Sequence, residues 1–265
     1  MRRLAADWVP DGAWLAPGYA EWLPPAALRG AVACLWARVV LDEEAATGGL
    51  VLPDGCSDLI WERGVGAYVA GPDTGPVRTS APAGTVLAGV RFRPAAGGAA
   101  LGLPLSEVRD QRVGLADLLR SGGSGPAAGG RLPADLPPAA AAARLLDIAG
   151  LLIADGTPDP AMARAAAMLR DPAVRADDVA AAVWLSERQF RRRCHAAAGY
   201  GPKTLQRVFR FQRFVHRIDA PAGASGPLDL AAAAAEAGYA DQAHLTRECA
   251  ALSGLTPAVL ARTRR

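Results

Sequence analysis

Histidine, lysine and closely spaced cysteine are scarce in this chain of 265 residues. Its three histidines, His195, His216 and His244, all follow residue 160. A metalloenzyme of the cupin kind, which needs several imidazoles, is therefore nearly excluded from the first 160 residues. A catalytic Ser-His-Asp or Cys-His pair within that part is excluded for the same reason.

The four cysteines, Cys34, Cys56, Cys194 and Cys249, form no CxxC pair. We therefore expect no structural zinc site, no other metal site, no cofactor and no disulfide framework. Cys56 lies in a Pro-Asp-Gly-Cys turn, but no histidine or lysine stands beside it to lower its pKa. We predict no catalytic residues and hence a protein that is not an enzyme.

Long apolar runs are also missing. No stretch of about 18 apolar residues is free of charge, so no transmembrane helix and no membrane partner are expected. Asp7, Asp11 and Glu21 interrupt any apolar core of a signal peptide. The expected location is the cytoplasm.

Charge is distributed unevenly along the chain. Residues 1–160 contain 13 arginines and 17 acidic residues, a net charge of −4. Residues 161–265 contain 16 basic and 9 acidic residues, a net charge of +7. The basic part is therefore a candidate for binding a polyanion. Its excess is concentrated over 188–217, a stretch that contains no acid and is followed by Asp219.

Overall, the sequence predicts the α+β class. Residues 1–120 are expected to form a β-rich barrel-like or sandwich-like domain, because short apolar runs such as 59–61 and 86–92 alternate with Gly and Pro. A Gly/Pro/Ala-rich linker is expected over 121–143, followed by a helical domain over 144–265. An amphipathic helix over 139–154 has two open interpretations, packing within its own domain or dimerisation.

An internal repeat organises the helical domain. Phe190, Cys194 and Gly199 match Leu245, Cys249 and Gly254 at an offset of 55 residues. Each copy predicts a helix, a short turn, a second helix and a helix that begins with proline. The pattern is that of two helix-turn-helix units, at about 174–200 and 228–255, joined by a long helix over 202–218.

The second helix of each unit is the candidate recognition helix. Asp177 or Asp178 is expected to cap the preceding helix, and Ser186 caps the first recognition helix with Gln189 in a capping box. Arginine pairs with guanine and phosphate, Gln with adenine, and Thr with either base or a thymine methyl. The candidate DNA-facing side chains are Arg188, Arg191 and Arg192 in the first unit and Gln242, Thr246 and Arg247 in the second.

The repeat resembles the AraC/XylS family of bacterial transcriptional activators. The closest stretches are SERQFRRRCHAAAGYGPKTLQRVFRFQRF and LAAAAAEAGYADQAHLTRECAALSGLTPAVL. The resemblance implies a seven-helix domain that places two recognition helices in successive major grooves on one face of DNA. It implies base contacts at the six residues named above. It also implies backbone contacts from Ser186, Lys203, Thr204 and Arg207.

Two features depart from that family. Cys194 and Cys249 stand where the family usually has phenylalanine. Trp184 stands where the second unit has Gly238, and a tryptophan does not easily adopt a positive φ. The first turn is therefore expected to differ in shape from the second.

The first 120 residues resemble an uncharacterised domain that precedes AraC-type modules. The matching segments are LPDGCSDLIW, AGPDTGPVRT, GVRFRPAAGGAALGLP and EVRDQRVGLADLL. The resemblance implies a regulatory domain and supplies no ligand.

Tryptophan is concentrated in this first domain, at positions 8, 14, 22, 36 and 61. These rings form either its core or an effector pocket. The candidate effector residues are Trp36, Trp61, Tyr68, Arg91 and Arg93. Arg91 and Arg93 are expected on one side of a strand, either to bind an anionic effector or to pair with Asp54, Asp58 or Asp73.

We therefore predict a transcriptional regulator that binds double-stranded promoter DNA, with RNA polymerase as an expected partner. A small-molecule effector would act at the first domain. The alternatives are a ligand-independent regulator whose first domain only forms a homodimer, and a fused enzyme in which Cys56 accepts an alkyl group. Alkyl-accepting regulators of this family carry a cysteine-rich zinc domain, which this chain lacks.

Overall fold

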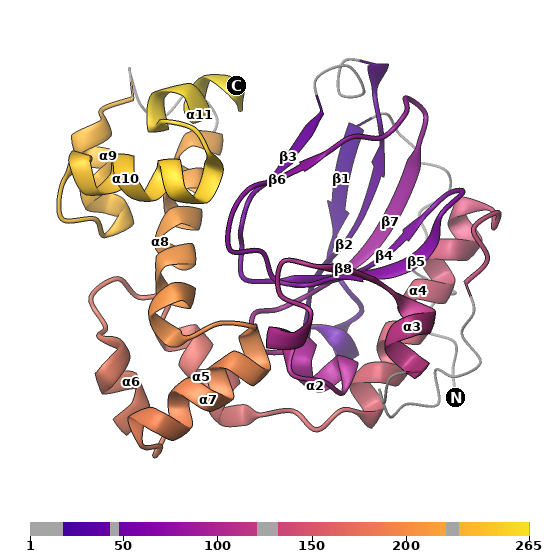
Figure 1. Ribbon diagram of the computed structural model, residues 1–265, viewed down its shortest axis with the longest axis horizontal. Helices are drawn as coiled ribbons and strands as arrows, with labels where there is room; N and C mark the ends of the chain where they lie inside the picture. The colour runs from indigo at the N-terminus through magenta and orange to yellow at the C-terminus, as the bar shows by residue number, and fades with distance from the viewer. Residues whose placement is uncertain (1–17, 43–47, 121–131, 221–227, 265) are drawn as a thin grey trace.

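The structure, a computed structural model, describes residues 18–42, 48–120, 132–220 and 228–264. It confirms the predicted α+β class: an antiparallel sheet domain is followed by a helical domain, and the two lie side by side (Figure 1). Residues 121–131 of the expected linker and the tryptophans at positions 8 and 14 lie outside the described residues.

Six strands form one antiparallel sheet in the order β1-β2-β7-β4-β5-β8, and β3 pairs with β6 in a separate two-stranded ribbon. The predicted apolar runs 59–61 and 86–92 fall in strands of the sheet, as expected from their β-branched and aromatic residues. The strands are β1 (Gly18–Trp22), β2 (Val32–Val39), β3 (Gly49–Val51), β4 (Ser57–Glu62), β5 (Gly66–Ala70), β6 (Val77–Thr79), β7 (Val86–Phe92) and β8 (Arg112–Gly114).

Side chains alternate between the two faces of the sheet. On β2, Leu35 and Ala37 belong to a large buried cluster, whereas Cys34 and Trp36 point to the opposite face, where a smaller cluster forms. The larger cluster is covered by α4 (Pro138–Asp155), whose Leu145 and other apolar residues one turn apart lie within it. The amphipathic segment therefore packs on the sheet of the first domain, and the boundary expected at residue 144 falls inside this helix.

The helical domain contains the two predicted helix-turn-helix units, joined by the long helix α8. None of the helices in the described ranges is both long and apolar enough to span a membrane. The helices are α2 (Gly97–Leu101), α3 (Leu115–Arg120), α4 (Pro138–Asp155), α5 (Pro160–Met168), α6 (Ala176–Ala182), α7 (Glu187–Ala198), α8 (Pro202–Asp219), α9 (Leu230–Ala237), α10 (Gln242–Ser253) and α11 (Pro257–Thr263), with short 3-10 helices at Ala26–Leu28 and Leu105–Glu107.

Helix caps follow the sequence with one correction. The predicted capping box is present: the Ser186 hydroxyl accepts a hydrogen bond from the Gln189 amide, and the Gln189 side chain accepts one from the Ser186 amide. The N-cap of α6 is Arg175, so the expectation of Asp177 or Asp178 was wrong. Both carboxylates lie instead in the first turn, where they interact favourably with the positive end of the helix.

The turn of the first unit also corrects an expectation. Trp184 adopts φ of 59°, close to the 85° of Gly238, so the two helix ends have the same shape. Each helix end is closed by the same pair of backbone hydrogen bonds. The amide of Trp184 or Gly238 donates to the carbonyl three positions earlier, and the amide of the next residue donates to the carbonyl five positions earlier. The indole is 91% exposed, so this left-handed conformation costs backbone energy without a steric clash in the core.

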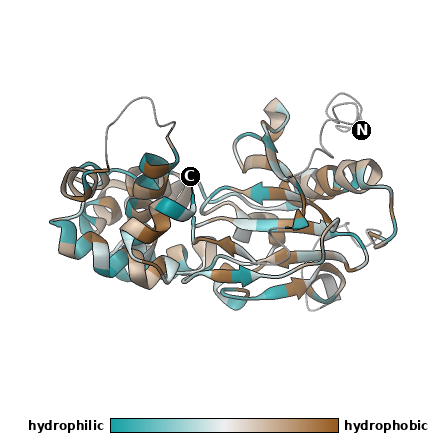
Figure 2. Ribbon diagram, turned by 90° about the horizontal axis from the view of Figure 1, so that it is seen from above, coloured by the Kyte–Doolittle hydropathy of each residue, from teal (hydrophilic) through white to brown (hydrophobic). Residues whose placement is uncertain are grey.

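The sheet domain packs directly against the helical domain. The Gln212 side-chain amide on α8 donates to the Pro53 carbonyl at 2.7 Å, and Gly55 lies against Leu205. At the end of α7, the Arg109 guanidinium donates to the Gly199 carbonyl at 3.3 Å. Figure 2 shows the helices beside the end of the sheet. These contacts place the sheet domain beside the first helix-turn-helix unit.

Candidate nucleic-acid interface

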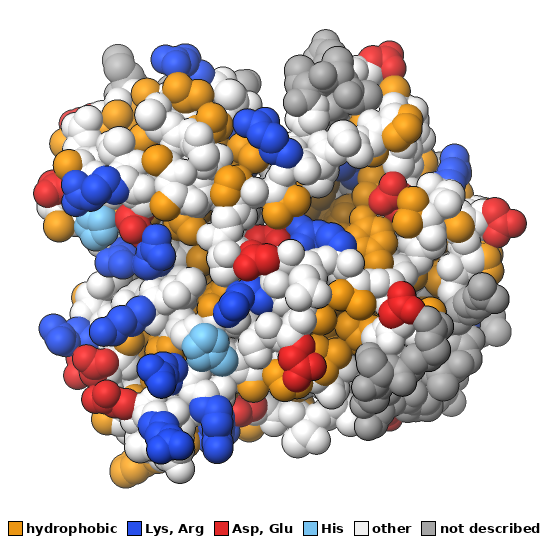
Figure 3. Space-filling model, viewed as in Figure 1, with side chains coloured by type: hydrophobic (Ala, Val, Ile, Leu, Met, Phe, Trp, Pro, Cys, Tyr) orange, Lys and Arg blue, Asp and Glu red, His pale blue; other side chains and the backbone are white. Residues whose placement is uncertain are grey.

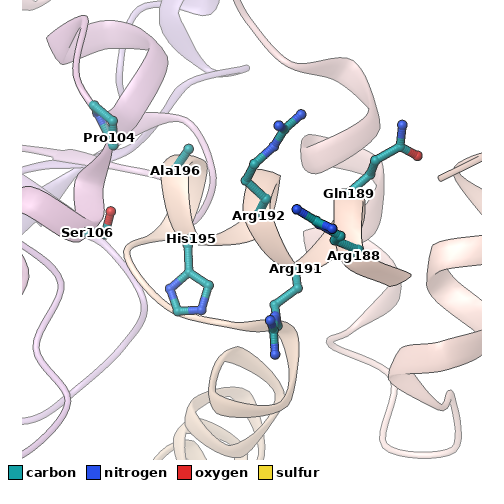
Figure 4. A pocket seen from close by; sticks show the side chains of 8 residues that line it. All are labelled: Pro104, Ser106, Arg188, Gln189, Arg191, Arg192, His195 and Ala196. Atoms are coloured by element: carbon teal, nitrogen blue, oxygen red, sulfur yellow. The ribbon is translucent and has the colours of Figure 1, made fainter. Parts of the chain in front are cut away.

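The exposed face of α7 is basic. Arg188, Arg191 and Arg192 are exposed and share one side of the helix, because they are three and four positions apart. Phe190 and Cys194 are buried on the opposite side, in the core of the domain. Figure 4 shows the three guanidinium groups projecting from the helix. Such groups are suited to guanine edges and to phosphates.

A hollow of about 480 Å³ lies on one side of this arginine face, between α6, α7 and the start of α8. The structure brings four of the predicted DNA contacts together there: Arg188, Arg191, Lys203 and Thr204. Asp177 and Glu187 also line the hollow, so they partly offset the positive charge of the basic residues there. Lysine and threonine at the start of a helix are suited to contacting a phosphate.

A second hollow, of about 670 Å³, lies along the other edge of the arginine face of α7. Its wall opposite α7 is formed by Pro104 and Ser106 of the sheet domain (Figure 4). His195 also lines it; burial, followed by the charges of Arg109 and Arg191, lowers the pKa of this histidine, so its imidazole is mostly neutral at pH 7. Sequence reasoning missed Ser106, because nothing in the sequence links it to a helix 80 residues later.

The second recognition helix, α10, begins at the predicted cap. The Asp241 carboxylate accepts a hydrogen bond from the His244 amide at 2.6 Å. Gln242 and Arg247 are exposed, and Thr246 is half-buried with its hydroxyl donating to the Gln242 carbonyl at 2.8 Å. Gln242 and Thr246, four positions apart, lie on the same side of α10, and Arg247 lies next to Thr246 on the adjoining side. The hydrogen bond fixes the orientation of the threonine methyl group.

The structure corrects the expectation that the basic side chains of the helical domain have no acidic partners. The local sequence suggested that the arginines over 188–217 have no acidic partner. In the structure, three of them form ion pairs with acids: Arg193, Arg207 and Arg217. Arg193 pairs with Asp159 and Arg217 with Glu236, while Arg207 pairs with Glu248 of α10 at 2.6 Å. The predicted phosphate contact Arg207 therefore connects the linking helix to the second recognition helix. Figure 3 shows several basic side chains over the helices at the lower left, with acidic side chains among them.

The five candidate effector residues lie in three different places in the structure. Trp36, Tyr68 and Arg91 lie on the sheet face opposite α4. Trp61 is fully buried on the α4 face, and its indole N–H donates to the Pro133 carbonyl at 2.9 Å. Arg93 follows the end of β7, where its guanidinium donates to the Arg29 carbonyl. The sequence grouped these five because it gives no cross-strand register.

Arg91 is surrounded by carboxylates. It lies 3.1 Å from Asp58, 3.6 Å from Asp54 and 3.5 Å from Glu21. Burial raises the pKa of Asp58, and Arg91 and the Trp36 indole oppose that rise. Of the two interpretations of Arg91, the structure supports ion pairing, and it leaves little positive charge for an anionic effector.

Cys56 lies close to the same cluster. Burial, followed by the charge of Asp54, raises the pKa of its thiol well above the ordinary value. A thiolate nucleophile is therefore disfavoured at this position. This observation weighs against the alternative in which Cys56 accepts an alkyl group.

Two helix-turn-helix units joined by one helix, with basic and polar side chains on the exposed faces of their second helices, define a DNA-binding protein. Residues 179–263 match a family model described as a helix-turn-helix domain, and residues 20–114 match one described as a domain of unknown function, DUF6597. The chain thus carries an AraC-type helix-turn-helix domain behind a DUF6597 domain, and it is a DNA-binding regulator of the AraC type.

Among solved structures, the chain is similar to ToxT from Vibrio cholerae. The structure from strain O395 shares 9% identity over 81% of this chain and 93% of that chain, with a TM-score of 0.43. A crystal form at 1.65 Å has 9% identity over 92% and 98%, with a TM-score of 0.44. The wild-type protein from strain SCE256 with bound unsaturated fatty acid has 11% identity over 81% and 89%, with a TM-score of 0.42. No curated protein sequence is significantly similar to the chain.

Proposed function

We propose that this protein binds promoter DNA with sequence specificity by placing α7 and α10 in successive major grooves. The observation that carries the proposal is the single continuous helix, α8, that connects the two units. Helix α8 has 18 residues and is therefore about 27 Å long, close to the roughly 34 Å of one DNA turn. An ion pair between Arg207 and Glu248 fastens α8 to α10 and supports a fixed spacing.

In this proposal the side chains divide into two roles. Arg188, Arg191 and Arg192 contact base edges in the first groove, and Gln242, Thr246 and Arg247 do so in the second. Ser186, Lys203 and Thr204 contact the phosphates beside α7. The first unit supplies most of the phosphate affinity, because α10 carries one arginine between the acidic residues Asp241 and Glu248.

A mobility-shift titration with genomic fragments from upstream of candidate target genes tests the proposal. If Arg192 makes a bidentate base contact, replacing it with alanine should lower the affinity for a specific fragment by roughly 5- to 150-fold. Replacing Lys203 with alanine should lower the affinity for all fragments alike and reduce the dependence of that affinity on salt concentration. Binding without any sequence preference by the unaltered protein would refute the proposal.

We further propose that the sheet domain controls this binding through a small-molecule effector on the face that bears Trp36, Tyr68 and Arg91. Because three carboxylates surround Arg91, a neutral or cationic effector fits this face better than an anionic one. RNA polymerase is the proposed partner at the promoter, and a homodimer is compatible with the same role. If the sheet domain only dimerises, no effector should change the melting temperature or the mobility shift.

A further inference from the structure

The two hollows beside α7 lie on opposite sides of its arginine face. Both are lined by Arg188 and Arg191. The smaller hollow extends from these residues toward Lys203 and Thr204 of the helical domain, whereas the larger extends from Arg192 toward Ser106 of the sheet domain. The recognition helix is therefore flanked by two walls, one from each domain.

A DNA major groove has matching dimensions. It is roughly 12 Å wide, and an α-helix with its side chains is about 10–12 Å across, so a helix in the groove has one phosphate strand on each side. The strand on the side of the smaller hollow would meet Lys203 and Thr204. The opposite strand would enter the larger hollow, between Arg192 and Ser106.

We propose that the sheet domain takes part in DNA binding, with the Ser106 turn forming the second phosphate-facing wall beside α7. This inference rests on the proposed placement of α7 in the major groove. The chemistry of the larger hollow suits a phosphate strand, because it combines three arginines, the hydroxyl of Ser106 and the ring of His195.

The wall is held in position by close contacts between the domains. A Cβ on Gly98 would lie 2.6 Å from the Ala196 carbonyl, and a Cβ on Gly199 would lie 2.4 Å from Pro72. The Arg109 guanidinium donates to the Gly199 carbonyl and adds positive charge near the hollow. The neighbouring Glu107 is exposed but does not line it.

Two opposite charge changes at Ser106 in the full chain test the proposal. Ser106→Asp should weaken binding to every DNA fragment by roughly 3- to 10-fold, because a carboxylate would face the phosphates. Ser106→Arg should strengthen binding by a similar factor and steepen the slope of log affinity against log salt by about 1. If Ser106 only packs the two domains together, both substitutions should change the DNA affinity in the same direction.

Ser80→Asp and Ser80→Arg are the matched controls, because they change the net charge equally on an exposed residue that lines neither hollow. Thermal melting of each variant checks that the fold is kept. If both Ser106 variants bind like their Ser80 counterparts while Arg192→Ala still weakens specific binding, the wall is refuted and the proposed function stands. If the unaltered protein binds DNA without preference, the proposed function fails first.

Discussion

At the scale of single residues, pairing decides which arginines are available to a ligand. Arg193 is directed toward Asp159 at the start of α5, whereas Arg192, one position earlier, is exposed. Asp159 has two tasks, since its carboxylate also accepts a hydrogen bond from the Met162 amide as the N-cap of α5. Of these two neighbouring arginines, Arg193 is therefore held in an ion pair, whereas Arg192 is open to a ligand.

Replacing Asp159 should separate these two tasks. Asp159→Ala should lower the free energy of unfolding by about 1–2 kcal/mol through the lost cap, and Asp159→Asn by less, because asparagine also caps helices. Although burial opposes it, the hydrogen bond from Arg193 and those from the backbone hold the pKa of Asp159 below its ordinary value. Its carboxylate therefore stabilises the fold above the unfolded pKa, and that stability is lost as the pH falls through the folded pKa.

Urea titrations at neutral and acidic pH measure the effect. The stability difference between the unaltered protein and Asp159→Asn should shrink as the pH falls below about 4. A difference that is independent of pH would show that the Asp159 charge contributes nothing to stability.

At the scale of elements, both recognition helices end at a glycine in the left-handed conformation. Gly199 has φ of 83° and Gly254 has φ of 71°. Their surroundings differ: a Cβ at Gly199 would lie 2.4 Å from Pro72, whereas one at Gly254 would lie 3.7 Å from Pro76. The sheet domain therefore touches the ends of both recognition helices, and it presses closely on the first.

This difference predicts unequal costs for two identical substitutions. Gly254→Ala should lower the free energy of unfolding by about 1 kcal/mol, the cost of a left-handed alanine. Gly199→Ala should cost at least about 1 kcal/mol more, because its methyl group also clashes with Pro72. Denaturant unfolding of both variants checks this. Equal costs would contradict the close contact between α7 and the sheet domain.

The helices of the two units were largely predictable from the sequence, but the contacts between elements far apart in the sequence were not. The repeat with its caps and prolines indicated both helix-turn-helix units, because these signals are local. The separation of Trp36 from Trp61 was missed, because register between strands depends on the whole sheet. The pairing of Arg207 with Glu248 was also missed, since it joins residues 41 positions apart. The shape of the turn at Trp184 was mispredicted, because an exposed side chain can tolerate a strained backbone.

At the scale of the whole molecule, the charge asymmetry has a structural counterpart. The acidic sheet domain faces the basic helical domain and touches α7, α8 and the end of α10. The loop that holds Asp54 beside Arg91 also carries Pro53, which accepts the hydrogen bond from Gln212 on α8. The sheet face that bears Arg91 is therefore connected to the helical domain through this one short loop.

Methylation interference on a specific promoter fragment maps the guanines that the protein contacts in the major groove, and it therefore tests where α7 and α10 bind. Placement of α7 and α10 in successive major grooves predicts two clusters of interfering guanines on one face of the DNA, about one helical turn apart. Arg192→Ala should lose the cluster contacted by α7 and keep the other. A single cluster, or interference spread evenly along the fragment, would contradict the placement of both recognition helices in successive major grooves.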